Sequence, residues 1–365
     1  MSASRWRQLA VLGQSVWYDN VARPALRCGL LQRIVEEDHV TGGTSNPSIF
    51  AQAVESSDLY DEEISSAPLA ESTESLFQRL AIADIQQACD VVRAVWERTG
   101  GQDGYISIEE EASIAFDVEA AVARGHELRD LVDRPNVMIK VPGTEAGVRA
   151  FRRLTREGVS VNVTLLFARS RYEAVAEAYI AGLEERHAAN EDLSAIASVA
   201  SFFVSRIDSK IDTQLPADSP LRGRAALANA QLAYADVFLP AFTSDRWRAL
   251  ASAGANLQRP LWASTGVKDP AYPSTLYVDE LVAAGTVTTV PDETLEAFRE
   301  HGIAAPTLHA AAPHAQALLD DLAAAGVDLD AVTLELEAEG VKRFEKAYDD
   351  MITAIAEKRD RILTA

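Results

Sequence analysis

Cysteine is almost absent from this chain, whose 365 residues contain only Cys28 and Cys89, far apart and without the spacing of metal ligands. A disulfide scaffold and a cysteine-based zinc site are therefore not expected, and a reducing cytoplasm fits this composition best. The six histidines form neither a His-x-His nor a His-Glu-x-x-His pattern. We therefore expect no structural or catalytic metal.

Long apolar runs and an excess of positive charge are also missing. No stretch approaches ~18 uncharged apolar residues, and the N-terminal sequence is not followed by such a run, so neither a membrane span nor a signal peptide is expected. The 34 Lys and Arg residues face 55 Asp and Glu residues, which gives a formal net charge of −21. This balance argues against nucleic acid or an anionic membrane as the main partner. Any phosphate site must be built locally, from a few cations and backbone amides.

The organisation of the chain favours one domain over residues 1–365, because no linker rich in Pro, Gly or Ser divides it and no repeat is present. Hydrophobic residues make up 48% of the sequence, enough for a sizeable core. Short β-rich segments alternate with amphipathic helical patterns, which is typical of parallel βαβ units in an α/β fold. Eight strand candidates favour a closed (β/α)8 TIM barrel. A doubly wound open sheet is the alternative, but no Gly-x-Gly-x-x-Gly follows the first strand.

The expected elements can be given by residue number. Strands are predicted at 15–19, 40–45, 105–109, 137–141, 159–165, 195–203, 260–265 and 286–290. Helices are predicted at 76–98, 114–127, 144–156, 171–185 and 221–238, with a polar loop at 208–224. A long C-terminal helix at about 334–363 is expected to pack across the barrel, and Gly340 is expected to break or kink it.

Lys140 stands out because it lies in the apolar segment Val-Met-Ile-Lys-Val-Pro-Gly at 137–143, which predicts a short buried strand. Side chains alternate along a strand, so Lys140 shares one face with Met138 while the valines and Ile139 take the other. Burial disfavours the ammonium and favours the free amine, which attacks a carbonyl to form a Schiff base. The alternative is a strand-end lysine that reaches water or pairs with a carboxylate.

Polar side chains recur on one face of the other predicted strands. The candidates are Asp19, Glu109, Asn162, Thr164 and Ser201. Taken singly, each has an ordinary explanation: Glu109 begins an acidic run typical of a solvated loop edge, and Asp19 fits a helix cap or turn. Taken together with Lys140, they predict an active site at the carboxyl ends of the strands, because burying so many polar groups without a use is costly.

Three motifs resemble those of transaldolases. Thr-Ser-Asn-Pro-Ser-Ile-Phe at 44–50 resembles a signature of that family, and the strand at 137–142 resembles its active-site lysine strand. The segment 158–167 is similar to the strand that follows. The motifs occur in the right order and spacing, with 201–206 behind them, and the resemblance covers about residues 15–289. The length suits the longer bacterial type.

The resemblance implies a class I aldolase-type barrel that works in the non-oxidative pentose phosphate pathway without metal or cofactor. Such an enzyme moves a dihydroxyacetone unit from sedoheptulose 7-phosphate or fructose 6-phosphate to glyceraldehyde 3-phosphate or erythrose 4-phosphate. Lys140 matches the Schiff-base lysine, and Asp19 matches the acid/base that takes the proton of the C4 hydroxyl. Glu109 and Thr164 match the pair that activates a water for carbinolamine dehydration and hydrolysis.

The resemblance also implies which residues bind the substrate. Positions that hold the hydroxyls of the dihydroxyacetone unit are matched by Asn46, Asn162 and Ser201. Arg206 matches the arginine of the family's phosphate site. For the second cation the chain offers Lys268, where an arginine is expected, with Ser264 as a hydroxyl contact. A lysine there supplies a point charge without bidentate geometry, and its alternative is a solvated loop lysine.

Two other functions stay open at this point. One is a sister aldolase that releases free dihydroxyacetone, and the other is a catalytically idle barrel that only binds ligands. The expected partners are small sugar phosphates, with no nucleic acid and no membrane. We expect a cytoplasmic monomer or homodimer.

Overall fold

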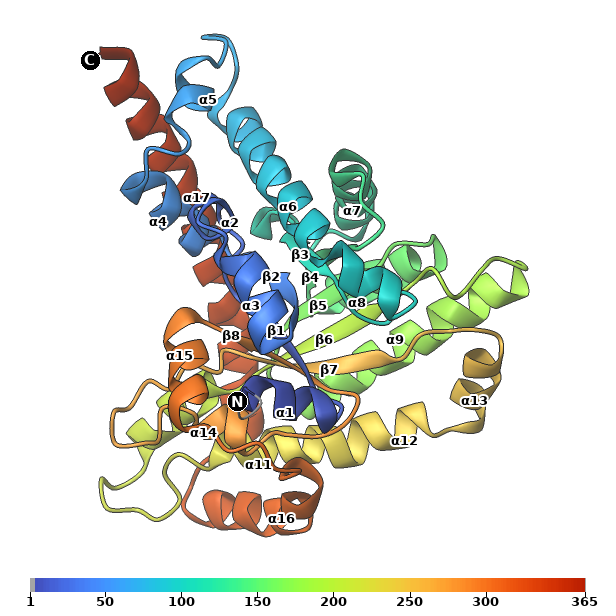
Figure 1. Ribbon diagram of the computed structural model, residues 1–365. Helices are drawn as coiled ribbons and strands as arrows, with labels where there is room; N and C mark the ends of the chain where they lie inside the picture. The colour runs from blue at the N-terminus through green and yellow to red at the C-terminus, as the bar shows by residue number, and fades with distance from the viewer. Residues whose placement is uncertain (1–3, 365) are drawn as a thin grey trace.

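The computed structural model describes residues 4–364 and contains a closed barrel of eight parallel strands with helices between them (Figure 1). Neighbouring strands follow one another in chain order, and β8 pairs with β1 to close the barrel. The prediction of a (β/α)8 TIM barrel is confirmed. Residues 1–3 and 365 of the expected domain lie outside the described residues, and the assignment of the chain to one domain stays a prediction.

Each strand of the barrel lies where the hydrophobic pattern predicts one, with ends shifted by a few residues. The strands are β1 (Ser15–Tyr18), β2 (Val40–Thr44), β3 (Ile106–Glu109), β4 (Val137–Pro142), β5 (Val161–Leu166), β6 (Ser198–Phe203), β7 (Gln258–Ala263) and β8 (Val287–Val290). All residues of β4, β5 and β6 are buried. Burial on both faces explains their near-continuous apolar sequences, because helices cover the outside while side chains fill the inside.

The helices surround the barrel and include several short ones in the connections. In the first half they are α1 (Arg5–Val11), α2 (Arg23–Arg27), α3 (Leu30–Asp38), α4 (Pro47–Ser56), α5 (Asp61–Ser65), α6 (Thr73–Arg98), η1 (Ala112–Ile114), α7 (Val118–Val132) and α8 (Glu145–Arg156). In the second half they are α9 (Arg169–Ala188), α10 (Ser205–Ile211), η2 (Asp212–Gln214), α11 (Ala225–Leu232), η3 (Ala233–Phe238), α12 (Leu239–Phe242), α13 (Asp245–Ser252), α14 (Leu276–Asp279), α15 (Asp292–His301), α16 (Leu308–Ala324) and α17 (Leu329–Thr364).

The polar stretch 208–224 is only partly the loop that its composition predicts. The end of α10 and the short helix η2 lie within it. Two of its carboxylates are buried and accept backbone hydrogen bonds: Asp208 from the amide of Ala226 at 2.8 Å and Asp212 from the amide of Gly223 at 3.0 Å. These acidic residues therefore hold neighbouring backbone in place instead of facing water.

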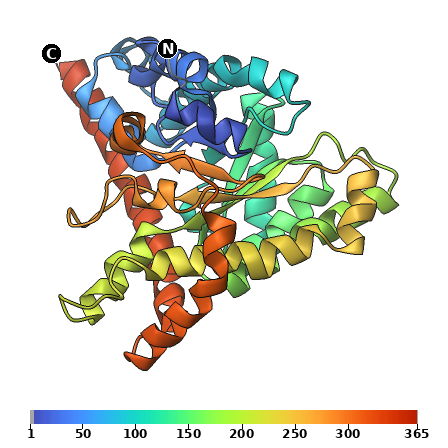
Figure 2. The same ribbon diagram turned by 60° about the horizontal axis from the view of Figure 1, so that its bottom comes forward.

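The C-terminal helix α17 runs along one side of the barrel as a single long helix (Figure 2). It begins at Leu329, earlier than the expected start near 334, and it contacts α4, α5, α6, α10, η1 and β5. The predicted break at Gly340 is wrong, because the helix continues through this residue. Gly340 instead allows the helix to approach Leu165 at the end of β5.

A second apolar cluster outside the barrel holds the far half of α17. Met351 and Ile355 of α17 pack there with side chains of α4, α5 and α6, among them Leu76, and with Tyr60 directly before α5. The Arg23 guanidinium lies beneath this cluster, 4.3 Å from the Tyr60 ring centroid, and pairs with a buried carboxylate of α6. This packing places α17 beside the barrel mouth.

The amino ends of the strands are closed by a buried polar group. Asp103 accepts hydrogen bonds from Trp17 Nε1 at 2.9 Å and from Ser15 Oγ at 2.5 Å, and Arg259 Nη2 lies 3.1 Å from its Oδ1. Burial alone would raise the pKa of Asp103, but the charge of Arg259 and the hydrogen bonds hold the pKa below its usual value. The carboxyl ends of the strands remain open for a site.

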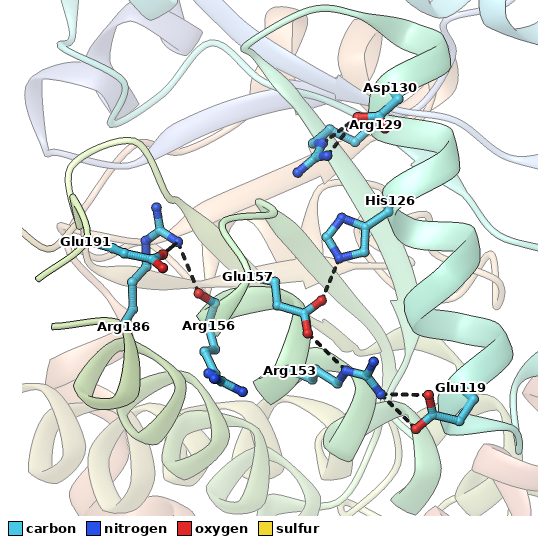
Figure 3. A network of polar contacts seen from close by, with 9 residues as sticks. All are labelled: Glu119, His126, Arg129, Asp130, Arg153, Arg156, Glu157, Arg186 and Glu191. Carbon is cyan, nitrogen blue, oxygen red and sulfur yellow. Dashed lines mark hydrogen bonds and ion pairs between the residues drawn. The ribbon is translucent and has the colours of Figure 1, made fainter. Parts of the chain in front are cut away.

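A polar network ties helices of the outer ring together (Figure 3). His126 Nε2 of α7 lies 2.6 Å from Glu157 Oε2, and Arg153 of α8 donates to Glu157 Oε1 at 3.0 Å. Arg153 also pairs with Glu119 of α7 at 2.7 Å. The members are exposed or half-buried, so each pair contributes little to stability, and the network mainly fixes how α7 and α8 lie against each other.

Candidate active site

Lys140 lies inside the barrel near its mouth, on β4. The residue is 6% exposed, and its Nζ is 3.4 Å from Glu109 Oε1 and donates a hydrogen bond to the Ser45 carbonyl at 3.2 Å. The ring centroid of Phe344 lies 5.6 Å from the same nitrogen. The amine is therefore buried as the alternation of the strand predicts, but a carboxylate and an aromatic face accompany its apolar neighbours.

A cavity of ≈ 750 Å³ lies at the carboxyl ends of the strands, and Lys140 is part of its wall. The other predicted site residues that line it are Asp19, Asn46, Thr164, Ser201, Arg206, Ser264 and Lys268. Glu109 and Asn162 do not line this cavity. Glu109 is joined to it by its ion pair with Lys140, and Asn162 by a hydrogen bond from Ser201.

Strand register explains why residues so distant in sequence meet. Glu109 on β3 is level with Lys140 on β4, and Lys140 is level with Asn162 on β5. In parallel strands, residues in register share a face, so all three point inward. Asn162 is fully buried; it donates to Ser107 Oγ at 3.0 Å and accepts from Ser201 Oγ at 2.6 Å. Asn162 thus fixes the position of the Ser201 side chain.

Two acidic side chains act on the amine: Glu109 on the neighbouring strand β3, and Asp19 directly after β1. Burial raises the pKa of Glu109 to about 7, while the charge of Lys140 acts in the opposite direction. Burial also raises the pKa of Asp19, and Lys140 and the hydrogen bond from Thr44 oppose that rise. A carboxyl with a pKa near neutrality exchanges its proton readily at physiological pH, as general acid–base catalysis requires.

Thr164 lines the cavity with a fully buried hydroxyl that has no hydrogen-bond partner among residues 4–364. The register of β5 against β6 shifts between Val163 and Leu166, and Leu165 adopts a left-handed backbone with φ 60°. Such irregularities redirect side chains next to active sites. The free hydroxyl of Thr164 is available to a water molecule or a substrate.

One end of the cavity is cationic. Arg206 lies over the Phe203 ring at 5.2 Å, and burial together with the charge of Arg343 lowers the pKa of Arg206. Lys268 is exposed at the same end. Ser264, whose φ is 56°, also lines the cavity, and its Oγ lies 2.9 Å from Ser205 Oγ. Within the described range 4–364 neither cation has a carboxylate oxygen within ion-pair distance, although Glu109, Asp19 and Glu339 act on Arg206 at longer range. Two cations without carboxylate partners favour an anionic ligand.

Two residues near the amine were missed by the sequence analysis as site residues. Thr44 Oγ1 donates to Asp19 Oδ1 at 2.5 Å and lies 3.1 Å from Thr289 Oγ1. Its place in the motif at 44–50, two residues before Asn46, is a signal that could have revealed it. Phe344 was recognised only as an apolar residue of the last helix, because the sequence does not show which strand that helix faces.

No group of three His, Cys, Asp or Glu side chains in the part of the chain that the structure describes could hold a metal ion. Cys28 and Cys89 are free thiols. Over the same residues, no helix combines the length and the apolar character that crossing a bilayer requires.

Comparison with known proteins adds independent findings. Residues 16–355 match the family model described as transaldolase/fructose-6-phosphate aldolase. The chain is 47% identical to Transaldolase 1 of Streptomyces avermitilis over 94% of its length and 93% of that protein. It is 46% identical to Transaldolase 1 of Streptomyces coelicolor, over 98% of the chain and 96% of that protein. It is also 46% identical to the transaldolase of Thermobifida fusca, over 96% of the chain and 97% of that protein.

Proposed function

The chain belongs to the transaldolase/fructose-6-phosphate aldolase family and is a transaldolase, and we propose that Lys140 is the residue that forms its Schiff base. The observation that carries this proposal is the buried Lys140 amine, 3.4 Å from Glu109, in the wall of the cavity that Asp19 also lines. The reaction moves a dihydroxyacetone unit from a ketose phosphate to an aldose phosphate in the non-oxidative pentose phosphate pathway.

In the first half of the proposed reaction, Lys140 attacks the C2 carbonyl of sedoheptulose 7-phosphate or fructose 6-phosphate. Glu109, with a pKa near neutrality, protonates the hydroxyl of the carbinolamine, which leaves as water. The protonated imine then withdraws electrons from the C3–C4 bond. Asp19 takes the proton of the C4 hydroxyl, the bond breaks, and the aldose phosphate leaves.

In the second half, the three-carbon enamine stays bound until glyceraldehyde 3-phosphate or erythrose 4-phosphate enters. Asn46 and Ser201 line the cavity beside Lys140 and are the proposed partners of the hydroxyls of the dihydroxyacetone unit, with Asn162 behind Ser201. Holding the enamine favours transfer, because its protonation would release dihydroxyacetone. Glu109 and Thr164 are the proposed partners of the water that hydrolyses the imine.

The phosphate group is proposed to bind at the cationic end of the cavity. Arg206, with neighbours that orient its guanidinium over Phe203, provides the main charge, and Lys268 and Ser264 complete the site. Arginine offers several directed N–H donors to phosphate oxygens, whereas lysine offers a point charge. We further propose that the enzyme works in the cytoplasm as a monomer or homodimer, without nucleic-acid or membrane partners.

The test is reductive trapping. Borohydride added with fructose 6-phosphate should label Lys140 irreversibly, and Lys140→Ala should abolish both the label and the activity. A label on another lysine, or none on the active enzyme, overturns the proposal. Comparing products with and without erythrose 4-phosphate separates transfer from simple release of dihydroxyacetone. Substrate binding without imine formation would instead indicate a barrel that binds ligands but does not catalyse the reaction.

A further inference from the structure

A groove continues the cationic end of the catalytic cavity toward the surface, and its empty volume is ≈ 1170 Å³. Arg206, Ser264 and Lys268 line both spaces, so the groove and the cavity meet at the proposed phosphate site. The other walls of the groove come from α10, η2 and α17. We call it the outer groove.

The charge of the outer groove is opposite to that of the whole chain. The chain carries an excess of acidic residues, with a formal net charge of −21. Among the described residues that line the groove, cations outnumber carboxylates by four to one; they are Arg206, Lys210, Lys268, Arg343 and Glu339. A cluster of cations on an acidic protein raises the local concentration of small anions such as phosphate esters.

Arg343 lines this groove from α17, directly before Phe344, which lies over the Lys140 amine. Its side chain is 62% exposed, and its Nη2 lies 3.6 Å from Glu339 Oε2. Burial is the main reason why the pKa of Arg206 is lowered, and the charge of Arg343 is the next. The two guanidinium groups are therefore close enough to repel each other, and an anion bound beside both relieves this repulsion.

The carboxylate of Glu339 does not fully neutralise Arg343, because it is shared. Its Oε1 accepts a hydrogen bond from Lys210 at 2.5 Å, and this bond is the main cause of its lowered pKa. The distance of 3.6 Å to Arg343 is too long for a hydrogen bond. Lys210 is also held by Glu335 at 2.8 Å, so two carboxylates already balance its charge. The cations left to bind a ligand are Arg206, Lys268 and Arg343.

We propose that Arg343 is a specificity-determining residue, which binds the phosphate of the longer sugar substrates from the outer groove. The inference rests on the proposed Schiff-base function of Lys140, because that bond fixes C2 of every ketose at the same place. From there the carbon chain runs toward Arg206 and the groove. Sedoheptulose 7-phosphate carries its phosphate one carbon farther from C2 than fructose 6-phosphate does, so its phosphate lies nearer to Arg343. The shorter ketose leaves its phosphate with Arg206 and Lys268.

The same relation holds for the aldoses. Removing the dihydroxyacetone unit from sedoheptulose 7-phosphate leaves erythrose 4-phosphate, and removing it from fructose 6-phosphate leaves glyceraldehyde 3-phosphate. Each aldose therefore places its phosphate where its parent ketose does. The forward and reverse steps of a half-reaction pass through the same transition state, so a contact that stabilises it acts in both directions. The values of kcat/KM for sedoheptulose 7-phosphate and erythrose 4-phosphate must therefore change together.

The first experiment neutralises Arg343. Arg343→Gln should lower kcat/KM for sedoheptulose 7-phosphate roughly tenfold, as expected for the loss of one charge-assisted hydrogen bond, and should lower kcat/KM for erythrose 4-phosphate by the same factor. The loss for fructose 6-phosphate should be about twofold or less, because only a screened charge at longer range is removed. Lys346→Gln is the matched control. Lys346 is an exposed cation of the same helix, also paired with a carboxylate four residues away, and it does not line the groove, so neither ketose should be affected.

The second experiment removes the carboxylate that competes with the phosphate for Arg343. In Glu339→Gln, Arg343 loses its acidic neighbour while Lys210 keeps Glu335. The ratio of kcat/KM for sedoheptulose 7-phosphate to that for fructose 6-phosphate should therefore rise several-fold. General damage to α17 cannot produce such a gain, so this variant separates a contact with the substrate from a structural role.

The outcomes separate this inference from the proposed function. If borohydride does not trap Lys140 of the wild type with either ketose, the Schiff-base function itself fails. If Lys140 is trapped and Arg343→Gln lowers kcat/KM equally for both ketoses, or for neither, the role of Arg343 is wrong and the transaldolase reaction stands. An unchanged or lowered ratio in Glu339→Gln, or the same loss in Lys346→Gln as in Arg343→Gln, also contradicts that role.

Discussion

Gly340 of α17 packs directly against Leu165 at the end of β5. A Cβ atom on Gly340 would lie 3.0 Å from Leu165 Cδ2, closer than most carbon contacts in proteins. One turn further along the helix, Phe344 lies over the Lys140 amine. The small residue therefore sets how near α17 comes to the barrel mouth and where its aromatic ring covers the site.

Gly340→Val should displace α17 from the barrel. Its branched side chain collides with Leu165, which we expect to destabilise the fold by about 2 kcal/mol and to lower kcat because Phe344 moves with the helix. Thermal unfolding and steady-state kinetics measure both effects. Ala338→Val, at an exposed position of the same helix, is the control. It should lower the free energy of unfolding by only a few tenths of the amount expected for Gly340→Val. Wild-type kcat in Gly340→Val would show that the position of Phe344 is unimportant.

The contribution of Glu109 to the stability of the protein should decrease as pH rises. The pKa of this carboxyl is raised by burial from 4.5 to about 7, so the folded state binds more protons than the unfolded state between these values. The contribution of Glu109 to stability is then greatest below about pH 4.5 and falls by up to about 3 kcal/mol as pH rises through 7. Glu109→Gln cannot titrate and should lack this component. Urea unfolding at several pH values gives the free energy of unfolding as a function of pH. Parallel plots for the wild type and Glu109→Gln would contradict the prediction.

Thr44→Val should shift the pH dependence of kcat. The hydrogen bond from Thr44 lowers the pKa of Asp19, opposing the larger effect of burial. Without it, the Asp19 carboxylate that accepts the C4 proton forms at higher pH, and the acidic limb of kcat should move upward by about one unit. Thr44→Ser keeps the hydroxyl and should leave the limb in place. An unchanged limb in Thr44→Val would exclude this role for the hydrogen bond.

Arg206 and Lys268 should differ in their contribution to phosphate binding. Arg206→Gln removes a buried guanidinium with directed donors and should raise KM for fructose 6-phosphate by roughly 30-fold or more, whereas Lys268→Met should cost roughly tenfold because the lysine is exposed. Activity with unphosphorylated fructose, which has no group for this site, should be nearly unaffected. Equal effects on both sugars would place the phosphate elsewhere.

Arg259→Met should destabilise the protein at the amino ends of the barrel strands without changing the catalysed reaction. It leaves the buried Asp103 carboxylate without its cation, a loss of about 3–5 kcal/mol. The folded-state pKa of Asp103 is depressed in the wild type, so its contribution is present above the unfolded pKa and is lost in acid; the variant should lose this acid sensitivity. Unfolding curves at several pH values and kcat at low temperature provide the measurements. A large fall in kcat in the folded variant would contradict a purely structural role.

The pattern of the sequence predicts much of this fold because alternation is a local property. The apolar side of each strand must face the helices, so Lys140, Asn162 and Thr164 could be placed inside the barrel before any contact was known. The strand order also follows from chain order, since short βαβ connections leave few other topologies. The resemblance at 44–50 and 137–142 then identifies the chemistry.

The ends of the helices and the path of α17 were harder to predict from the sequence. Gly340 looks like a helix breaker when only propensity is considered, but a contact with Leu165, far away in sequence, outweighs the intrinsic cost. The buried carboxylates of 208–224 resemble loop residues for the same reason, because their partners come from other segments.

The sequence by itself determined the barrel, the inward-facing lysine and the residue types of the site, because side-chain alternation and motif order act over a few neighbouring residues. Only the tertiary structure decided that Phe344 covers the amine and that Thr44 holds Asp19. These relationships depend on distances between segments that meet only when the chain closes into a barrel and α17 packs beside it.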